Sequence, residues 1–314
     1  MLCFLFSTWQ INLCQLCTYV VKKIAMKEMV KEVEIEENWD LVIQPKSKWY
    51  DLRLGEIIRY KDLLLLFVRR DFVSLYKQTI LGPLWFFIQP IITSITFTVI
   101  FGNLAKISTD GLPQILFYMC GVTLWTYFSD TLTKTSDTFT ANANIFGKVY
   151  FPRMIVPLSV VVSNLIKLGV QFLLFIIIWV FYLITTSSVH PNSALLLVPL
   201  LVILMGFLGL SLGIIISSLT TKYRDLKFLV VFGVQLMMYA SPIVYPLSIV
   251  PEKYKWIILA NPVTSIIETF KYAFLGVGEF NWMHLAYSLS VTMVLFILGL
   301  IIFHRVEKSF MDTV

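Results

Sequence analysis

Residues 195–219 read LLLVPLLVILMGFLGLSLGIIISSL, and no charged side chain interrupts them. An α-helix needs roughly 20 mainly apolar residues to cross the roughly 30 Å hydrocarbon core of a bilayer. The stretch is therefore predicted to be a transmembrane helix. A hydrophobic content of 58% and a mean hydropathy of +0.80 over 314 residues indicate that it is not the only one.

Five more apolar stretches occur along the chain, and short polar links separate them. They cover residues 83–101, 112–131, 154–184, 228–245 and 284–303. The pattern predicts an all-α membrane protein with six transmembrane helices. Six spans leave little length for a separate soluble domain.

Basic side chains are concentrated ahead of the first predicted span. Twelve of the 25 Lys and Arg residues lie between Lys22 and Lys77. Cytoplasmic segments of membrane proteins carry such an excess, so both termini are predicted to be cytoplasmic. The net charge of +6 is therefore assigned to contact with anionic membrane lipids, and a nucleic-acid partner is not predicted.

The chain divides into four predicted regions. They are an N-terminal cytoplasmic or membrane-surface segment (1–50), an amphipathic interfacial helix (51–79), the transmembrane domain (80–304) and a cytoplasmic tail (305–314). The interfacial helix is predicted because apolar side chains from Leu54 to Leu75 recur every three or four residues, with Arg53, Arg59 and Arg70 off that stripe.

The segment before the last span is apolar but contains many prolines. Pro242, Pro246, Pro251 and Pro262 break it into pieces too short to cross a bilayer. A single crossing here would also move the basic tail to the outer side. The pattern therefore predicts two re-entrant half-helices on the outer face, at residues 256–260 and 263–275.

Six short motifs, in order along residues 45–314, resemble those of type-2 ATP-binding-cassette permeases. They are RRDFVSLYKQTILGPLW (69–85), NIFGKVYFPR (144–153), YRDLK (223–227), SPIVYP (241–246), NPVTSIIETFK (261–271) and EKSFMD (307–312). The resembled family exports lipid-linked polysaccharides such as O-antigen, capsule and teichoic acid. The resemblance implies a permease subunit in a bacterial inner membrane, present as a homodimer with two copies of an ATPase subunit.

No G-x-x-x-x-G-K-[ST] motif occurs in the chain, so ATP and Mg are expected to bind to the partner ATPase and no cofactor to this chain. The cysteine spacing indicates neither a disulfide framework nor a metal site. In the resembled family the link holding Asn144, Ile145, Phe146 and Lys148 is a coupling helix that contacts the ATPase. The alternative is a loop that dips into the lipid headgroups.

A second link contains Tyr223 and Arg224, and it is either a further ATPase contact or a plain positive-inside loop. Arg69, Arg70 and Lys77 stand just before the first span, where the pyrophosphate of a carrier lipid would lie. Guanidinium groups suit phosphate oxygens. Ordinary anionic lipids would attract the same side chains.

Aromatic side chains within the spans or near their ends suit a path for a glycan, because sugar rings stack on aromatic faces. The predicted path residues are Trp85, Phe86, Tyr118, Trp125, Tyr127, Tyr239 and Tyr245, together with Glu268 and Lys271. Interfacial aromatic belts explain many such residues equally well. Glu268 and Lys271 are three residues apart and either face the exit or pair with each other.

Two further features fall inside predicted spans. Lys167 lies in the middle of the third span, where a charge needs a partner or water, so it either has a functional role or pairs with a carboxylate or backbone carbonyls. Gly206, Gly209 and Gly213 form a small-residue face in the fourth span, which favours close packing within one protomer over a dimer contact.

The leading hypothesis is a permease half that moves a lipid-linked, O-antigen-like polysaccharide outward. A drug or small-lipid exporter has the same architecture. A membrane glycosyltransferase or polymerase would need grouped acid or base side chains, but His190, His284 and His304 are scattered. An ion-coupled secondary transporter would usually show internal repeats, and the two halves show no obvious inverted copy.

Overall fold

The computed structural model describes residues 58–77, 81–149, 151–223 and 225–310, and these contain helices and loops but no strand. All of them belong to one unit of the chain, residues 49–314. The predicted segment 1–50 and residues 51–57 and 78–79 of the predicted interfacial helix lie outside the described residues. So do Arg224 and the last four residues of the predicted tail.

Among the residues that the structure describes, four helical segments are long and apolar enough to cross a membrane. They are Trp85–Leu104, Ile155–Thr185, Ser193–Thr220 and Trp282–Glu307. The first combines α4 (Trp85–Phe97) with the π-helical turn η2 (Thr98–Leu104), and the third combines the 3-10 turn η3 (Ser193–Leu197) with α9 (Val198–Thr220). The others are α8 (Ile155–Thr185) and α13 (Trp282–Phe310).

The other two predicted spans correspond to helices that differ from these four. The helix α5 (Gln114–Ser136) has 23 residues, a sufficient length, but it carries Asp130, Lys134 and several threonines. The helix α10 (Leu226–Tyr239) is apolar but has only 14 residues, about 21 Å at 1.5 Å per residue. The described helices thus support four spans by length and composition.

The polar composition of α5 follows from its central position. It packs against α4, α8, α9, α10 and α12, and most of its side chains are buried. Two of its threonines donate hydrogen bonds to backbone carbonyls one turn earlier, Thr123 to Met119 over 2.7 Å and Thr126 to Val122 over 2.8 Å. A helix surrounded by protein does not need the uniformly apolar surface that lipid imposes.

The glycine face of α9 packs against α5, which confirms the prediction of packing within one protomer. A Cβ at Gly213 would lie 2.5 Å from the Thr135 Cβ, and one at Gly209 would lie 3.1 Å from the Phe128 carbonyl oxygen. The side chain of Tyr127 covers Gly206 in the same way. The absence of side chains on this face is what allows α5 and α9 to approach closely.

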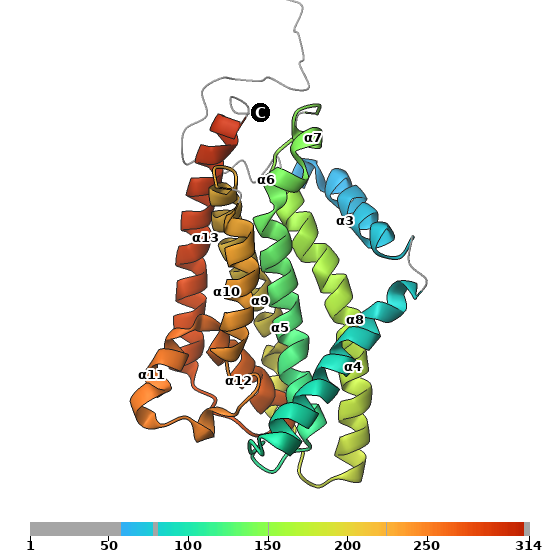
Figure 1. Ribbon diagram of the computed structural model, residues 1–314, viewed down its shortest axis with the longest axis vertical. Coiled ribbons are helices and arrows are strands. Elements are labelled where there is room, and N and C mark those ends of the chain that lie inside the picture. The colour runs from blue at the N-terminus through green and yellow to red at the C-terminus, as the bar shows by residue number, and fades with distance from the viewer. Residues whose placement is uncertain (1–57, 78–80, 150, 224, 311–314) are drawn as a thin grey trace, which may run out of the picture. The chain divides into compact units, whose positions relative to one another are not determined.

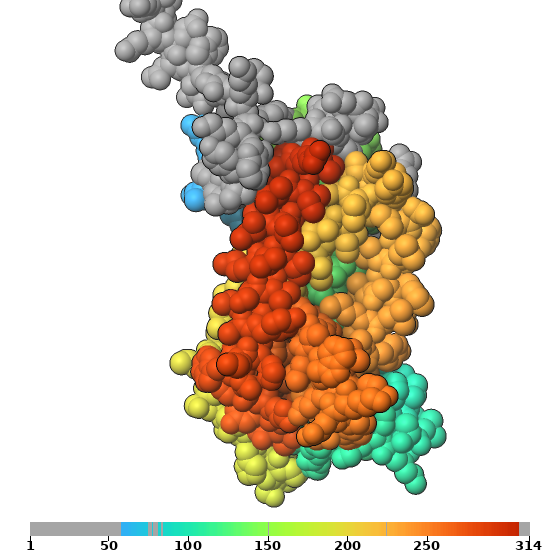
Figure 2. Space-filling view, turned by 90° about the vertical axis from the view of Figure 1, so that its left-hand side faces the viewer, coloured from blue at the N-terminus to red at the C-terminus, as the bar shows by residue number. Residues whose placement is uncertain are grey.

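Large apolar side chains are exposed on the outer helices, several of them more than half exposed. On α8, α10 and α13 they include Leu173, Ile177, Phe181, Phe228, Val231, Phe232, Met293, Val294 and Ile297. Figure 2 shows α13 and α10 side by side on one face, with α11 and α12 across one end. Exposed apolar surface of this extent is unusual for soluble monomers and suits contact with lipid or another membrane helix.

Short helices lie at both ends of the long ones (Figure 1). One end, here named the α7 end, holds α3 (Lys61–Tyr76), α6 (Thr138–Ala141), α7 (Ala143–Phe146) and the last turns of α13. The opposite end, here named the α11 end, holds α11 (Glu252–Ala260) and α12 (Pro262–Leu275). The helix α13 runs to Phe310 and includes the first residues of the predicted tail.

The described part of the predicted interfacial helix packs against α8 through one side only. Phe67 and Val68 are buried, whereas Leu65 is 59% exposed although it belongs to the predicted apolar stripe. Of the two predicted half-helices, α12 is buried along almost its whole length and α11 has no buried residue. Both are too short to cross a bilayer.

Candidate functional site

A chain of aromatic rings connects three elements at the α7 end. Phe67 of α3 lies 5.6 Å from Phe151, and Phe151 lies 5.6 Å from Phe146 of α7, measured between ring centroids. Phe139 of α6 lies 6.0 Å from Phe146 and stacks on Phe303 of α13 at 4.8 Å. The five rings, here named the aromatic chain, link α3 to α13 through the segment that joins α5 to α8.

Arg153 makes a second connection between this segment and α13. Its Nη1 donates a hydrogen bond of 2.7 Å to the Glu307 carbonyl oxygen, and its guanidinium carbon lies 5.6 Å from the Phe146 ring centroid. A carboxylate oxygen of Glu307 lies 3.1 Å from Nδ1 of His304. The motifs at 144–153 and 307–312, more than 150 residues apart, therefore meet at the α7 end.

The predicted coupling residues differ in exposure. Phe146 is 4% exposed because it belongs to the aromatic chain, and Ile145 is half-buried. Asn144 and Lys148 are exposed, and the neighbouring Val149 is 60% exposed. The surface that this link offers to a partner therefore consists of Asn144, Lys148 and Val149, with Phe146 turned into the protein.

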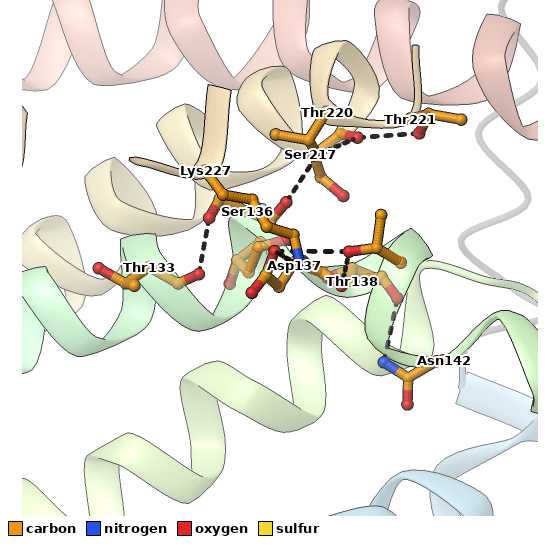
Figure 3. A network of polar contacts seen from close by, with 11 residues as sticks. Thr133, Ser136, Asp137, Thr138, Asn142, Ser217, Thr220, Thr221 and Lys227 are labelled. Atoms are coloured by element: carbon orange, nitrogen blue, oxygen red, sulfur yellow. Dashed lines mark hydrogen bonds and ion pairs between the residues drawn. The ribbon is translucent and has the colours of Figure 1, made fainter. Parts of the chain in front are cut away.

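The second predicted link is joined to the first by polar contacts (Figure 3). Lys227 forms an ion pair of 2.7 Å with Asp137, and the Thr220 hydroxyl donates a hydrogen bond of 3.0 Å to the Ser136 carbonyl. Tyr223 is 53% exposed on this link. The start of α10 and the end of α9 are thereby held against the end of α5, directly before the segment that carries the first link.

The three predicted phosphate ligands lie on α3 or directly after it, and all are exposed. Arg70 donates to the Asp71 carboxylate from Nε and Nη2, at 2.9 and 2.8 Å, and its guanidinium carbon lies 4.7 Å from the Phe67 ring centroid. Arg69 and Lys77 are exposed side chains of the same segment. The positive charge of this surface is thus partly neutralised by Asp71.

Most predicted path aromatics are buried within the single chain. Phe86, Tyr118, Trp125 and Tyr127 are at most 7% exposed, and Tyr245 is half-buried. Two others are exposed: Trp85 at the start of α4 by 47% and Tyr239 at the end of α10 by 45%. Of the predicted path aromatics, Trp85 and Tyr239 are therefore accessible on the single chain, whereas the buried rings pack between helices.

Glu268 and Lys271 form an ion pair with each other, 3.7 Å apart, and both are almost fully buried in α12. The Lys271 ammonium also donates to the Pro242 carbonyl oxygen and lies 3.7 Å from the Phe117 ring centroid. These contacts join the SPIVYP and NPVTSIIETFK motifs, as does a 2.9 Å hydrogen bond from the Asn261 amide to the Ser241 hydroxyl.

A cavity of about 160 Å³ lies beside this pair. Its lining consists of Asp110, Leu247, Ser248, Glu268, Gly278 and Glu279. Within the described residues, no group of three or more His, Cys, Asp or Glu side chains is arranged to hold a metal ion. Three carboxylate side chains therefore belong to the lining, but they do not have the geometry of a metal site.

A polar network within the helices was not predicted from the sequence, except for Lys167. The Lys167 ammonium forms an ion pair of 2.6 Å with Asp130 of α5, which bears out the prediction of pairing with a carboxylate. On the same helix Lys134 donates a 3.0 Å hydrogen bond to Asn164 of α8. Asp130 and Lys134 are four residues apart in an otherwise mostly uncharged helix, and that spacing was the available signal.

Comparison with known proteins relates the chain to membrane transporters. The O-antigen export system permease protein RfbA of Klebsiella pneumoniae is 30% identical over 251 residues, 80% of this chain and 94% of the relative. The protein of the same name from Myxococcus xanthus is 27% identical, over 70% of this chain and 82% of the relative. The polysialic acid transport protein KpsM of Escherichia coli is 21% identical, over 78% and 93%.

The pattern that defines ABC-2 type transporters matches residues 62–275, which include every helix from α4 to α12. This match covers more than half of the chain, and the described helices provide several apolar membrane segments. The protein is a multi-pass membrane protein, and the chain belongs to the ABC-2 type transporter family.

Proposed function

We propose that this chain is the permease subunit of an ATP-binding-cassette exporter that moves a lipid-linked, O-antigen-like polysaccharide outward across the bacterial inner membrane. The main support is the 30% identity, over 80% of the chain, to a relative named as an O-antigen export permease. The two ends of the molecule also suit different tasks, since the α7 end carries basic links and the α11 end carries an acidic cavity.

The topology proposed for this function has six crossings. The helix α5 is the second crossing, shielded from lipid by its neighbours, and α10 with the buried segment that follows it is the fifth. The α7 end and both termini are cytoplasmic, and α11 and α12 form a re-entrant pair on the outer face. Basic residues at the α7 end, such as Lys148, Lys222 and Lys227, agree with this orientation.

Two copies of the chain would enclose the pathway, and two ATPase subunits would bind at the α7 end. Nucleotide binding to the ATPase would move the link at Asn144 and Lys148. The aromatic chain and Arg153 would carry this movement to α3 and α13, because tightly packed rings transmit displacement with little compression. The reorientation of α3 would admit the lipid head.

The proposed function is tested by deletion and co-purification. Deletion of the gene should abolish surface polysaccharide while lipid-linked precursor accumulates, and the tagged permease should co-purify with an ATPase. Surface polymer that persists with intact precursor synthesis would reject the proposal. Loss of resistance to a toxic compound with unchanged surface polymer would instead identify a drug or small-lipid exporter.

Substitution of Lys148 by glutamate is expected to reduce co-purification of the ATPase about tenfold, since the exposed cation becomes an anion at the proposed contact. Lys106 is the matched control, because it is exposed on the loop before α5, toward the opposite end, and its replacement by glutamate should leave complex yield unchanged. Equal yields of co-purified ATPase from both variants would show that the link at Lys148 is not part of the ATPase contact.

A further inference from the structure

Five side chains from three helices form a polar group at membrane depth, here named the inner polar cluster. They are Gln89 of α4, Asp130 and Lys134 of α5, and Asn164 and Lys167 of α8. The Lys167 ammonium is 2.6 Å from an Asp130 carboxylate oxygen and 3.5 Å from the Gln89 amide oxygen. Lys134 and Asn164 are joined by a 3.0 Å hydrogen bond, so two polar contacts, Lys134 with Asn164 and Asp130 with Lys167, join α5 to α8.

The inner polar cluster is not sealed inside the chain. The side chain of Asp130 is 26% exposed, that of Lys167 is 13% exposed, and Gln89 is exposed. Asp130 lies six residues before the end of α5, about 9 Å along the helix, and Lys167 lies twelve residues after the start of α8, about 18 Å. Ionised groups at such depth rarely face lipid chains, and they mark water-filled cavities, pathways or protein contacts.

The charge of the cluster favours an anion. Two lysines face one carboxylate, and the remaining members are neutral amides. The Asp71 carboxylate also interacts electrostatically with Lys134, but it is already bonded to Arg70. The ring of Phe86 lies 5.9 Å from the Lys167 ammonium, and the exposed Trp85 precedes it. A cationic centre is therefore bordered by apolar rings.

The surroundings also connect the cluster to the predicted entry side. The helix α3, which carries Arg69 and Arg70, packs against α8, and α4 packs against both α5 and α8. An anion attracted by the exposed arginines of α3 would next meet Lys134 and Lys167 along the same helices. The order of these cations runs from the interface into the membrane.

We propose that the inner polar cluster binds the diphosphate of a lipid carrier during its passage, with Lys167 and Lys134 as the cationic ligands. This inference rests on the proposed function. The phosphate oxygens compete with Asp130 for the Lys167 ammonium, so Asp130 holds the lysine in place in the empty state and weakens anion binding. The isoprenoid chain lies along the apolar side formed by Phe86 and Trp85.

The competition makes the two partners of the ion pair differ in a measurable way. Lys167→Gln should weaken binding of a polyprenyl diphosphate about tenfold, because a charge-assisted hydrogen bond is lost and the net charge of the cluster falls. Asp130→Asn should strengthen it severalfold, because the competing carboxylate is removed. If the ion pair had only a structural role, both substitutions would change the affinity for polyprenyl diphosphate in the same direction.

The experiment uses the permease with its ATPase in lipid nanodiscs, titrated with a polyprenyl diphosphate and, separately, with the polyprenyl alcohol of equal length. Tryptophan fluorescence reports binding and thermal unfolding reports integrity. The double variant Asp130→Asn/Lys167→Gln keeps neutral hydrogen-bonding partners and serves as the folded reference. Weaker binding in Lys167→Gln, stronger binding in Asp130→Asn and no binding of the alcohol are the expected results.

Several outcomes would overturn the inference. Equal affinity of both single variants would assign the pair to structure alone, and equal affinity for inorganic pyrophosphate would assign the site to a soluble anion. Effective competition by phosphatidylglycerol would assign it to ordinary membrane lipid. Failure of the proposed function is distinguishable from failure of this inference. If the proposed function is wrong, deletion of the gene leaves surface polysaccharide unchanged. If only this inference is wrong, export of the polysaccharide still depends on the chain.

Discussion

Replacement of Gly213 by leucine is expected to prevent the protein from accumulating in a folded form. A Cβ at this position would lie 2.5 Å from the Thr135 Cβ and 3.2 Å from the Leu132 carbonyl oxygen, so it meets a side-chain branch and backbone that cannot turn away. Overpacking in a close-packed interior costs about 3 kcal/mol, at the upper end of its usual range. Since α5 is in contact with five other helices, its displacement would disturb the whole bundle.

The matched control is Gly169→Leu, because Gly169 is also a helical glycine in a predicted span, but a Cβ at this position would meet no atom of another segment within 4 Å. Yield of monodisperse protein in detergent and its thermal unfolding temperature measure the effect. The Gly169 variant should resemble the parent protein, and the Gly213 variant should aggregate. A Gly213→Leu protein with normal yield and unfolding temperature would contradict the packing described for α5 and α9.

Replacement of Lys271 by methionine is expected to lower the free energy of unfolding by about 4 kcal/mol. Methionine retains packing against Phe117, but it leaves the Glu268 carboxylate, 3% exposed, without its cation. It also removes the donor to the Pro242 carbonyl oxygen. Thermal or denaturant unfolding in detergent measures the loss.

The double variant Glu268→Gln/Lys271→Met should recover much of that loss, because no uncompensated charge remains buried. Lys255→Met is the matched control at the α11 end. Lys255 pairs with Glu279, which is 57% exposed, so its removal should cost under about 1 kcal/mol. A double variant that is as unstable as Lys271→Met would show that the lost contacts, not the stranded charge, cause the effect.

The α11 end shows what could and could not be predicted from the sequence. The four prolines after Ser241 predicted two short helices, and the structure has α11 and α12 close to the predicted positions. The sequence did not distinguish the buried α12 from the exposed α11, since the predicted pieces 256–260 and 263–275 are both largely apolar. It also left open whether Glu268 and Lys271 pair, because an i, i+3 spacing permits a contact but does not require one.

The coupling link shows the same limit on a candidate site. Its residues Asn144 to Lys148 were predicted as one contact surface, and only the structure separates the exposed Asn144 and Lys148 from the buried Phe146. Phe146 contacts Phe139 and Phe151 of the same link, and Phe139 in turn stacks on Phe303 of α13, more than 150 residues further along the chain. No local pattern could reveal that convergence.

The all-helical membrane class and the positions of most helices follow from the amino-acid sequence alone, because the requirement to match roughly 30 Å of hydrocarbon acts locally on composition and length. The tertiary structure decided which polar groups meet: Lys167 with Asp130, Arg153 with Glu307 and Lys271 with Pro242. Such pairs depend on how helices distant in sequence pack, and packing is set by surfaces that a linear pattern does not bring together.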